Sequence, residues 1–424
     1  MAIKRPGGLK SDQAALGQQP WVCAGETRAV MDALMAEGGM ARFVGGCVRN
    51  ALLGEPVGDV DIATDEIPER AMELLAARDI RVIPTGLDHG TVTAVIGGRT
   101  FEITTLRIDV ATHGRHADVA FTEDWVADAK RRDFTINALY ADADGTVYDP
   151  LGGQADLEAR RVRFIGDAVA RIREDYLRIL RFFRFHAHYG RGEPDGEALK
   201  ACAQEKQGLT QLSGERVRDE LLKIAAADEA AVAFRLMAAC GILPVVLPEA
   251  RSLERFERLV DIEAAQLFVC DPVRRLGAML DLDAEGVVAL AKRLHLSNKD
   301  RDRIAAMLTD QTKIVSYLSM REVRRALYRM GAELFRDRVM LAWASDVKSS
   351  NAVQWRALLA MADSWQKPDF PLTGQMVKAA GVPEGPIVGR VMREVEEWWI
   401  DADFTDDEFS IIERLKAVVQ ATVY

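Results

Sequence analysis

Residues 43–64 read FVGGCVRNALLGEPVGDVDIAT, and the rest of the chain is best interpreted from this stretch. The pattern predicts a strand, a turn at Gly45 and Gly46, a short helix, and a second strand that carries Asp59 and Asp61. Because successive side chains of a strand point to opposite faces, the two aspartates project from the same face. The stretch therefore predicts a pair of carboxylates close to a glycine turn.

A glycine pair before a helix exposes backbone N–H groups that can bind phosphate. Two neighbouring carboxylates repel each other unless cations lie between them, and divalent metal ions meet that need. The combination suggests metal-dependent chemistry on a nucleoside triphosphate. An isolated Asp-x-Asp pair is also common at solvated strand ends, so the rest of the chain has to decide between the two interpretations.

The chain has 424 residues, which predicts two to four domains, and its second half is rich in Ala, Leu, Arg and Glu. That composition favours a helical body. The formal net charge of −10 excludes a protein that coats nucleic acid by bulk attraction. Any surface that binds nucleic acid must therefore be a local patch.

The five cysteines are scattered and show no Cys-x-x-Cys spacing, which argues against a disulfide framework and against a zinc site. The first twenty residues lack an apolar signal core, and no run reaches the roughly 20 apolar residues that span a bilayer. We therefore expect a soluble, cytoplasmic protein with no membrane partner.

Two further strands are predicted over residues 91–96 and 100–105, on either side of a glycine turn. In the second strand, Glu102 shares a face with Thr100 and Thr104. This residue would place a third carboxylate on a neighbouring strand, where it could complete a metal site. An exposed polar strand face explains the pattern equally well.

The polar stretch 107–118 is predicted to be a mobile loop, and its histidines are given no metal role because lone loop histidines are mostly solvated. The turn signal DPLGG at 149–153 closes the strand-rich part of the chain. Beyond it the pattern is helical. Ser213 is a plausible N-cap for one of the later helices.

One helix is predicted from a cap at Asp167 to about His188, with an apolar stripe at Ile172, Tyr176, Ile179 and Phe183. Arg178, Arg181 and Arg184 recur on another face, with Asp175 one turn from Arg178. Charge runs of this kind are usually solvated, salt-bridged surfaces. These three arginines, however, outnumber the acids beside them and cannot all be paired locally.

Taken together, the motifs resemble one family, the class II tRNA nucleotidyltransferases (CCA-adding enzymes), and their relatives the bacterial poly(A) polymerases. The resemblance covers roughly residues 40–220. Each motif is weak alone, but the series occurs in the family's order. The motifs are GGCVR (45–49) with DVD (59–61), RRDFTINA (131–138), DPLGG (149–153), EDYLRILR (174–181) and SGER (213–216).

The resemblance implies an α+β protein. Its N-terminal head would be a polymerase-beta-like nucleotidyltransferase domain with a mixed sheet, followed by all-helical neck, body and tail. The corresponding boundaries are 1–153 for the catalytic head, 154–225 for the neck, 226–365 for the body and 366–424 for a tRNA-binding tail.

The resemblance also implies roles for the carboxylates. In the family, the residues that match Asp59 and Asp61 bind two Mg²⁺ ions, which activate the 3′-hydroxyl of the primer and stabilise the leaving pyrophosphate. Glu102 is the candidate for the third catalytic carboxylate. The substrates would be CTP and ATP.

Other matched positions would bind the nucleotide. Gly46 and Arg49 match residues that hold the triphosphate, and Arg132 matches a nucleotide-binding arginine. One departure is Asn50, which stands where the family often has aspartate; asparagine keeps the hydrogen bonding and loses the charge.

In the family, the residues that match Asp175 and Arg178 read the base edge in place of a template. Arginine donates to the carbonyl and ring nitrogen of cytosine, and aspartate accepts from an exocyclic amine. Cytosine and adenine both carry that amine, whereas uracil and guanine present a carbonyl. Arg181 and Arg184 would support base and phosphate contacts.

The implied function is template-independent addition of C, C and A to the 3′ end of tRNA, with no role for DNA. Alternatives are a poly(A) polymerase, a CC-adding or A-adding enzyme, or a non-catalytic RNA-binding protein. Residues 394–424 carry only Arg414 and Lys416 as basic residues, unlike the basic extensions of poly(A) members, and this favours CCA addition. The complete stretch 107–118 weakly supports addition of all three nucleotides.

Overall fold

The structure is a computed structural model of the chain. It divides into two compact units, residues 1–248 and residues 249–424, which we describe separately. The residues that the structure describes are 16–113, 116–346, 351–404 and 407–423.

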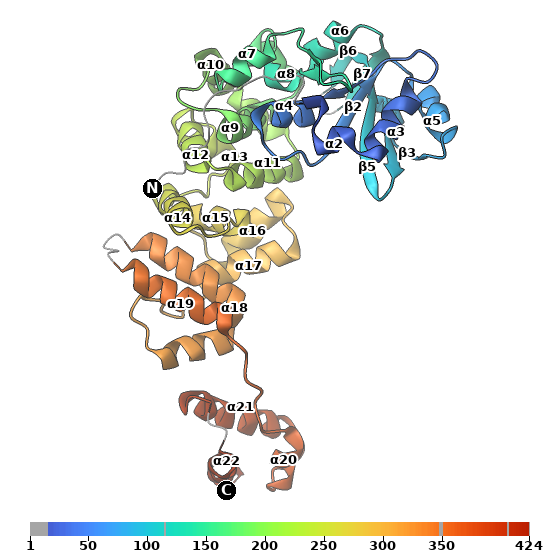
Figure 1. The fold of residues 1–424 in the computed structure, drawn as a ribbon. Helices are drawn as coiled ribbons and strands as arrows, with labels where there is room; N and C mark the ends of the chain where they lie inside the picture. The colour runs from blue at the N-terminus through green and yellow to red at the C-terminus, as the bar shows by residue number, and fades with distance from the viewer. Residues whose placement is uncertain (1–15, 114–115, 347–350, 405–406, 424) are drawn as a thin grey trace. The chain divides into compact units, whose positions relative to one another are not determined.

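The first unit is built on a seven-stranded mixed sheet with the strand order β3-β4-β5-β2-β1-β8-β9 (Figure 1). Strands β2 and β5 are parallel, and the other neighbours are antiparallel. This arrangement confirms the predicted mixed sheet. The strands are β1 (Ala41–Val44), β2 (Val60–Thr64), β3 (Arg81–Gly86), β4 (Thr91–Ile96), β5 (Arg99–Thr105), β8 (Tyr140–Ala141) and β9 (Val147–Tyr148).

Helices pack against one face of this sheet. The apolar residues Phe43, Ile62 and Ile103 point to that face and are fully buried there. Helices α3 and α5 supply the opposing apolar side chains, because both are amphipathic. The other short elements of this part of the chain are α2, α4 and η1. The bounds are α2 (Pro20–Cys23), α3 (Gly25–Leu34), α4 (Gly46–Leu53), α5 (Pro68–Ala76) and η1 (Leu87–His89).

The other face of the sheet is only half covered. Helix α6 (Trp125–Arg131) places Trp125 and Ala129 against Ala63 and Tyr140, in a cluster over β1, β8 and the end of β2. On the same face of β5, Glu102 remains exposed. The predicted carboxylates Asp61 and Glu102 therefore lie at the border between the covered half and the open half of this face.

The stretch 107–118 is not a loop, and that prediction is wrong. Strands β6 (Arg107–His113) and β7 (His116–Phe121) form a separate two-stranded antiparallel sheet. Backbone hydrogen bonding between the two strands holds such a ribbon together even when the side chains are polar. Gly114 and Arg115 lie outside the described residues.

The arginine-rich segment forms two helices, α8 (Ala168–Glu174) and α9 (Leu177–Tyr189), so the prediction of one continuous helix is wrong. Asp175 has an extended backbone, and its carboxylate accepts a 3.1 Å hydrogen bond from the backbone N–H of Leu177. The aspartate thus starts a new helix, as short polar side chains do at caps. The predicted cap at Asp167 is confirmed, since its carboxylate accepts from the Ala170 N–H.

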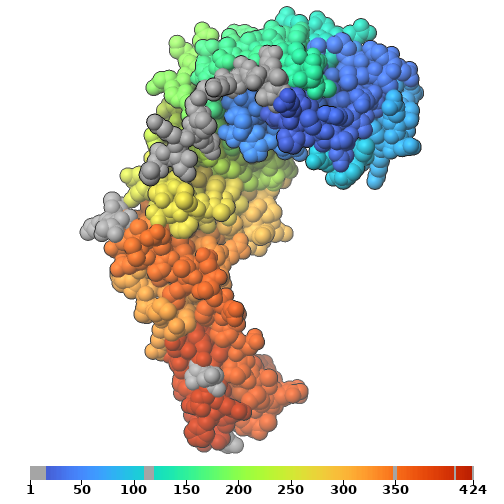
Figure 2. All heavy atoms as spheres, in the orientation of Figure 1, coloured from blue at the N-terminus to red at the C-terminus, as the bar shows by residue number. Residues whose placement is uncertain are grey.

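Among the remaining helices of the first unit, α11 and α12 pack against α9, and α10 packs against α8. Figure 2 shows the atoms of this unit, coloured from blue to green, in contact with one another. Ser213 does precede a helix, α11, but its side chain makes no capping hydrogen bond. The elements are η2 (Thr135–Asn137), α7 (Gly153–Glu158), α10 (Gly196–Glu205), η3 (Lys206–Gln211), α11 (Gly214–Ala226), α12 (Ala230–Ala239) and α13 (Leu243–Val246).

The second unit is helical throughout its described residues. Helix α18 is kinked at Gly331, whose φ of 79° favours glycine. The helices are α14 (Leu253–Gln266), α15 (Pro272–Met279), α16 (Ala284–Leu294), α17 (Asn298–Thr309), α18 (Met320–Ser345), α19 (Ala352–Ser364), α20 (Gly374–Ala379), α21 (Pro386–Asp401) and α22 (Glu408–Val423).

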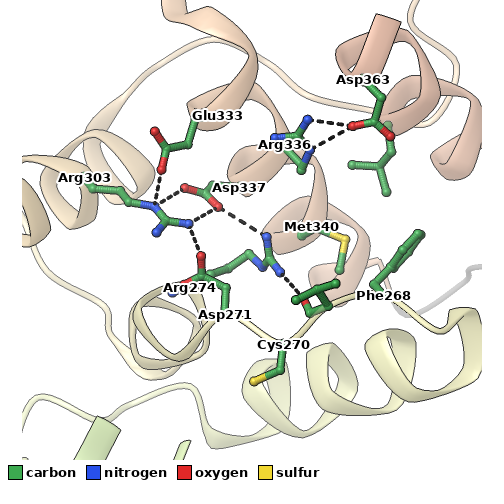
Figure 3. Close-up of a pocket in the computed structure, with 12 residues that line it drawn as sticks. Phe268, Cys270, Asp271, Arg274, Arg303, Glu333, Arg336, Asp337, Met340 and Asp363 are labelled. Atoms are coloured by element: carbon green, nitrogen blue, oxygen red, sulfur yellow. Dashed lines mark hydrogen bonds and ion pairs between the residues drawn. The ribbon is translucent and has the colours of Figure 1, made fainter. Parts of the chain in front are cut away.

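A network of ion pairs lies at a cavity of about 370 Å³ inside this second unit (Figure 3). Asp337 is fully buried and contacts both Arg303, at 2.7 Å, and Arg274, at 3.5 Å. Arg303 also pairs with Asp271, and Arg336 pairs with Asp363. Because these charges pair with one another, the network holds α15, α17 and α18 together. A search of the described residues finds no helix long and apolar enough to cross a membrane.

Candidate active site

A cavity of about 510 Å³ in the first unit brings together most of the predicted site residues. It opens where the β1–α4 turn, the end of α6, η2, the break between α8 and α9, and the start of α11 meet. Its volume is typical of a small-molecule site. The predicted residues that line it are Gly46, Arg49, Asp61, Arg132, Asp175, Arg178 and Arg181.

Three predicted residues do not line this cavity. Asp59 lines a neighbouring cavity of about 380 Å³ together with Trp21 and Arg99. Glu102 lies on β5 beside Asp61. Arg184 is turned away, since its guanidinium donates to Glu220 at 2.7 Å.

Asp61 and Glu102 lie side by side on two parallel strands, and together with the adjacent Asp59 we call them the carboxylate row. Asp61 on β2 is directly opposite Glu102 on β5, and Asp59 immediately precedes β2. Burial, and then repulsion from Glu102, raises the pKa of Asp61 to about 6, although attraction to Arg132 partly offsets the rise. Negative charge is therefore concentrated at this point of the sheet.

The donor set suits a cation that is shared with a phosphate. In the part of the chain that the structure describes, no three His, Cys, Asp or Glu side chains are arranged to hold a metal ion by themselves. Mg²⁺ in nucleotide enzymes is usually held by one or two carboxylates together with oxygens of the substrate phosphates. Asp59, Asp61 and Glu102 could therefore hold Mg²⁺ only together with further oxygens, such as those of a bound phosphate.

The glycine turn opens the start of α4 towards the cavity. Gly45 has φ 69° and ψ −115°, a backbone conformation that residues other than glycine rarely adopt. Its N–H donates to the carbonyl oxygen of Leu139 at 2.9 Å, which fixes the turn. Gly46 then begins the helix, so the first N–H groups of α4 lie at the cavity wall, where an anion is favoured.

Arg49 is buried, and its guanidinium is hydrogen-bonded to residues of α4, η2 and α9. Its guanidinium donates to Asn137 at 2.5 Å, to Asn50 at 2.9 Å and to the hydroxyl of Tyr189 at 2.7 Å. It also stacks on the ring of Tyr189, 4.0 Å from the centroid. Burial lowers the pKa of Arg49 from its usual value. Asn50 therefore supplies a hydrogen-bond acceptor to this arginine without a charge.

Arg132 is held by a second polar cluster. Its guanidinium contacts Asp128 and the hydroxyl of Tyr140, both at 3.2 Å. Burial alone would lower the pKa of Arg132, but attraction to Tyr140 and Asp128 outweighs it, so the pKa is raised. Arg132 is thus a fixed positive charge on the cavity wall.

Arg181 is paired with a residue that the sequence did not single out. Its guanidinium donates to the Asp133 carboxylate at 2.7 Å, and Asn137 donates to the same carboxylate at 2.9 Å. Burial would raise the pKa of Asp133, but Arg181 and these hydrogen bonds lower it to about 2. Asp133 and Asn137 therefore connect the site of Arg181 with that of Arg49.

Asp175 and Arg178, which are predicted to read the base, lie at the break between α8 and α9. The Asp175 carboxylate accepts a 2.7 Å hydrogen bond from Arg216 on α11. Arg178 pairs with Glu174 at 2.5 Å and donates to the carbonyl oxygen of Arg171 at 2.8 Å. An arginine and an aspartate, each oriented by a partner, thus face the same cavity.

Asp133, Asn137 and Arg216 line the cavity and contact predicted site residues, but they were not predicted as site residues from the sequence. All three lie within motifs that the sequence shares with the family, RRDFTINA and SGER. Their position within those motifs was the only sequence feature that could have identified them. Their hydrogen-bond partners, Arg181, Arg49 and Asp175, are remote in sequence, so local patterns do not predict the contacts.

Comparison with known proteins agrees with this geometry. A family model described as "Poly A polymerase head domain" matches residues 41–163, which contain the sheet, the carboxylate row and the glycine turn. A second, described as "Probable RNA and SrmB- binding site of polymerase A", matches residues 193–253.

Full-length relatives extend the match over both units. CCA tRNA nucleotidyltransferase 1, mitochondrial, of Mus musculus is 33% identical over 387 residues, 88% of this chain and 86% of that protein. The CCA-adding enzyme of Streptococcus sanguinis is 30% identical over 389 residues, 90% of this chain and 94% of that enzyme.

Among solved structures, the Bacillus stearothermophilus CCA-adding enzyme in complex with CTP superposes with a TM-score of 0.74. The two chains are 27% identical, and the match covers 96% of this chain and 98% of that enzyme. Sequence and fold agree over nearly the whole length. The chain belongs to the family of CCA-adding enzymes, the CCA tRNA nucleotidyltransferases.

Proposed function

We propose that this protein adds C, C and A in order to the 3′ end of tRNA, with CTP and ATP as substrates and no nucleic-acid template. In each addition, the 3′-oxygen of the tRNA forms a bond to the α-phosphorus of the nucleotide. The bond from that phosphorus to the oxygen bridging to the β-phosphate breaks, pyrophosphate leaves, and the hydroxyl proton is released to solvent.

The observation that carries this proposal is the continuity between the arginine-lined cavity and the carboxylate row. Asp61 belongs to both, because it lines the cavity and lies opposite Glu102 on the sheet. A triphosphate on the Gly45–Gly46 turn would place its negative charge near Arg132, which is fixed by Asp128. Its α-phosphate would then lie close to Asp61.

Asp59 and Asp61, with Glu102 beside them, would hold two Mg²⁺ ions. When bound, the ions would lower the pKa of the primer hydroxyl and neutralise charge on the leaving pyrophosphate. By holding the ions, the three carboxylates would determine where the charge of the pyrophosphate is neutralised. Burial and mutual repulsion leave Asp61 with an unfavourable negative charge that a cation relieves.

Asp175 and Arg178 would select the base. Asp175 would accept from the exocyclic amine of C or A, and Arg178 would donate to the acceptors of the ring. Both side chains are oriented before any nucleotide binds, Asp175 by Arg216 and Arg178 by Glu174. Such preorganisation reduces the entropy that binding costs and strengthens discrimination. Arg181 would support the cavity wall, and Arg184 would act only through its stacking on the ring of Phe185.

The alternatives are less well supported. The head-domain model is shared with poly(A) polymerases, but the relatives that match over both units are named as CCA-adding enzymes. A non-catalytic RNA-binding protein would have no need of an intact carboxylate row. The boundaries 1–153, 154–225, 226–365 and 366–424 remain our proposal for head, neck, body and tRNA-binding tail. A cytoplasmic location is likewise a proposal, as the mouse relative is named mitochondrial.

The test is incubation of the protein with tRNA that lacks its 3′-terminal CCA, with CTP and ATP separately and together, followed by sequencing of the products. The proposal predicts addition of CC with CTP alone and of CCA with both nucleotides. A run of A residues would identify a poly(A) polymerase instead. Unchanged tRNA under all conditions would contradict an enzymatic function.

A further inference from the structure

The open half of the sheet carries a surface of threonine hydroxyls next to the carboxylate row. Four residues form this threonine face: Thr85 on β3, Thr91 and Thr93 on β4, and Thr104 on β5. Their hydroxyls pair across the strands, Thr85 with Thr93 at 2.9 Å and Thr91 with Thr104 at 3.1 Å. The threonine face is therefore directly next to Glu102, the outermost of the three carboxylates.

Strand register fixes the position of this face relative to Asp61. Asp61 is opposite Glu102, Glu102 is opposite Thr93, and Thr93 is opposite Ile83, so four strands contribute one continuous row. Residues opposite each other in a sheet point to the same face. The row leads from the catalytic carboxylates outwards to the edge strand β3.

The two sides of Asp61 differ in chemistry. The β1 side carries the glycine turn and the arginine-lined cavity, which suits the triphosphate. The β5 side carries Glu102 and the threonine face, and the arginine of this face, Arg81, lies on the edge strand β3. In phosphoryl transfer the attacking and leaving oxygens are roughly in line through phosphorus. With pyrophosphate leaving on the β1 side, the attacking hydroxyl has to approach from the β5 side.

The hydroxyls of the threonine face suit the backbone of single-stranded RNA. Each hydroxyl has one donor and two acceptor sites, so a threonine pair that shares one hydrogen bond keeps a further donor and several acceptors. A ribose 2′-hydroxyl needs both kinds of partner, and phosphate oxygens need donors. Ile83, 37% exposed at the end of the row, adds apolar contact area for a sugar or base.

We propose that the threonine face binds the 3′-terminal nucleotides of the tRNA primer, with Thr93 and Thr104 contacting the ribose 2′-hydroxyl and the phosphate nearest the reacting end. The inference rests on the proposed function, because it assigns the second substrate of the same reaction. It makes the threonines positioning residues that present the 3′-hydroxyl to the carboxylate row.

The test compares the wild type with Thr93→Val, Thr104→Val and the double variant. Each protein is assayed on two tRNAs, one that ends in a ribonucleotide and one that ends in a 2′-deoxynucleotide, which keeps only the 3′-hydroxyl. Valine keeps the shape and suits a strand, so folding is retained. Each lost hydroxyl should raise KM for tRNA by about threefold to tenfold. KM for CTP should stay the same, and the preference of the wild type for a ribonucleotide end should fall.

Three controls keep the result specific. Thr93→Ser retains the hydroxyl and should restore KM for tRNA, whereas Thr146→Val, in an exposed turn between β8 and β9, should change nothing. Arg99→Ala tests the cavity beside Asp59 as a competing primer site.

Unchanged KM and unchanged sugar preference in the double valine variant would overturn the inference, as would a primer defect confined to Arg99→Ala. In either case the wild type would still add CCA. Failure of the proposed function itself would instead appear as a wild type that adds nothing.

Discussion

Arg216 donates a 2.7 Å hydrogen bond to the Asp175 carboxylate, although 41 residues separate them. The bond joins α11 to the break between α8 and α9, and it orients the carboxylate that we assign to base reading. Without Arg216 that carboxylate would keep its backbone bond to Leu177 but lose its charged partner.

We therefore expect Arg216→Ala to weaken base selection. The change removes a charge-assisted hydrogen bond, worth about 1.5–3 kcal/mol when buried, from a partly exposed pair, so the lower part of that range applies. Discrimination of CTP over UTP should fall by about tenfold, measured as the ratio of kcat/KM values. Arg218→Ala, two residues away and paired with Asp219, is the matched control. Equal losses in the two variants would contradict the assignment.

The carboxylate row makes a prediction about activity without loss of stability. Asp61→Asn should abolish nucleotide incorporation, and Glu102→Gln should reduce it. The Tm of Asp61→Asn in the absence of metal should equal or exceed that of the wild type, because burial and Glu102 already oppose the charge on Asp61. Single-turnover incorporation and thermal unfolding measure the two effects. An active Asp61→Asn protein would refute the assignment.

Asp133 makes a prediction about acid stability. Its pKa falls from 3.8 to about 2 on folding, so the folded state binds this proton less readily than the unfolded state. The stabilisation is therefore fully present above about pH 5 and is lost as the pH falls through about 2, with a magnitude of roughly 2 kcal/mol.

Asp133→Asn should accordingly show a shallower loss of unfolding free energy than the wild type as the pH falls from about 5 to about 2.5. Urea unfolding of the first unit at several pH values measures the slopes. Parallel curves for the two proteins would show that the Asp133–Arg181 pair does not carry this pH dependence.

The ion network of the second unit makes a prediction about folding alone. Asp337→Ala leaves Arg303 and Arg274 without their shared buried partner, so it should destabilise this unit by about 3–5 kcal/mol. Asp363→Ala breaks the exposed pair with Arg336 and should cost about 0–1 kcal/mol. Chemical denaturation distinguishes them. Similar midpoints for the two variants would contradict a structural role for Asp337.

Local pattern predicted those parts of the site in which neighbouring residues determine the geometry. Strand alternation predicted that Asp59 and Asp61 share a face and that Glu102 is a third carboxylate on a neighbouring strand. The register of the structure puts Asp61 and Glu102 side by side. The glycine pair likewise marked the turn before α4, where the φ of Gly45 is 69°.

The remaining features of the fold and site depend on contacts between residues far apart in sequence, so the sequence patterns did not predict them. Helical periodicity could not reveal that the Asp175 side chain ends one helix and starts another, since that depends on its own bond to Leu177 and on Arg216. Nothing in the sequence around Tyr189 predicts that its hydroxyl accepts a hydrogen bond from Arg49. That contact forms only because α9 packs close to α4 in the folded chain. The β6–β7 ribbon depends on backbone pairing that polar composition does not report.

The most direct test of the account is single-nucleotide incorporation on three tRNA ends, one lacking CCA, one ending in the first C and one ending in CC. Each is offered CTP, ATP, UTP and GTP separately, to the wild type and to Arg178→Ala. The account predicts CTP, CTP and then ATP for the wild type, and incorporation of UTP or GTP by the variant on at least one end. Retention of the full order by Arg178→Ala would contradict selection by this cavity.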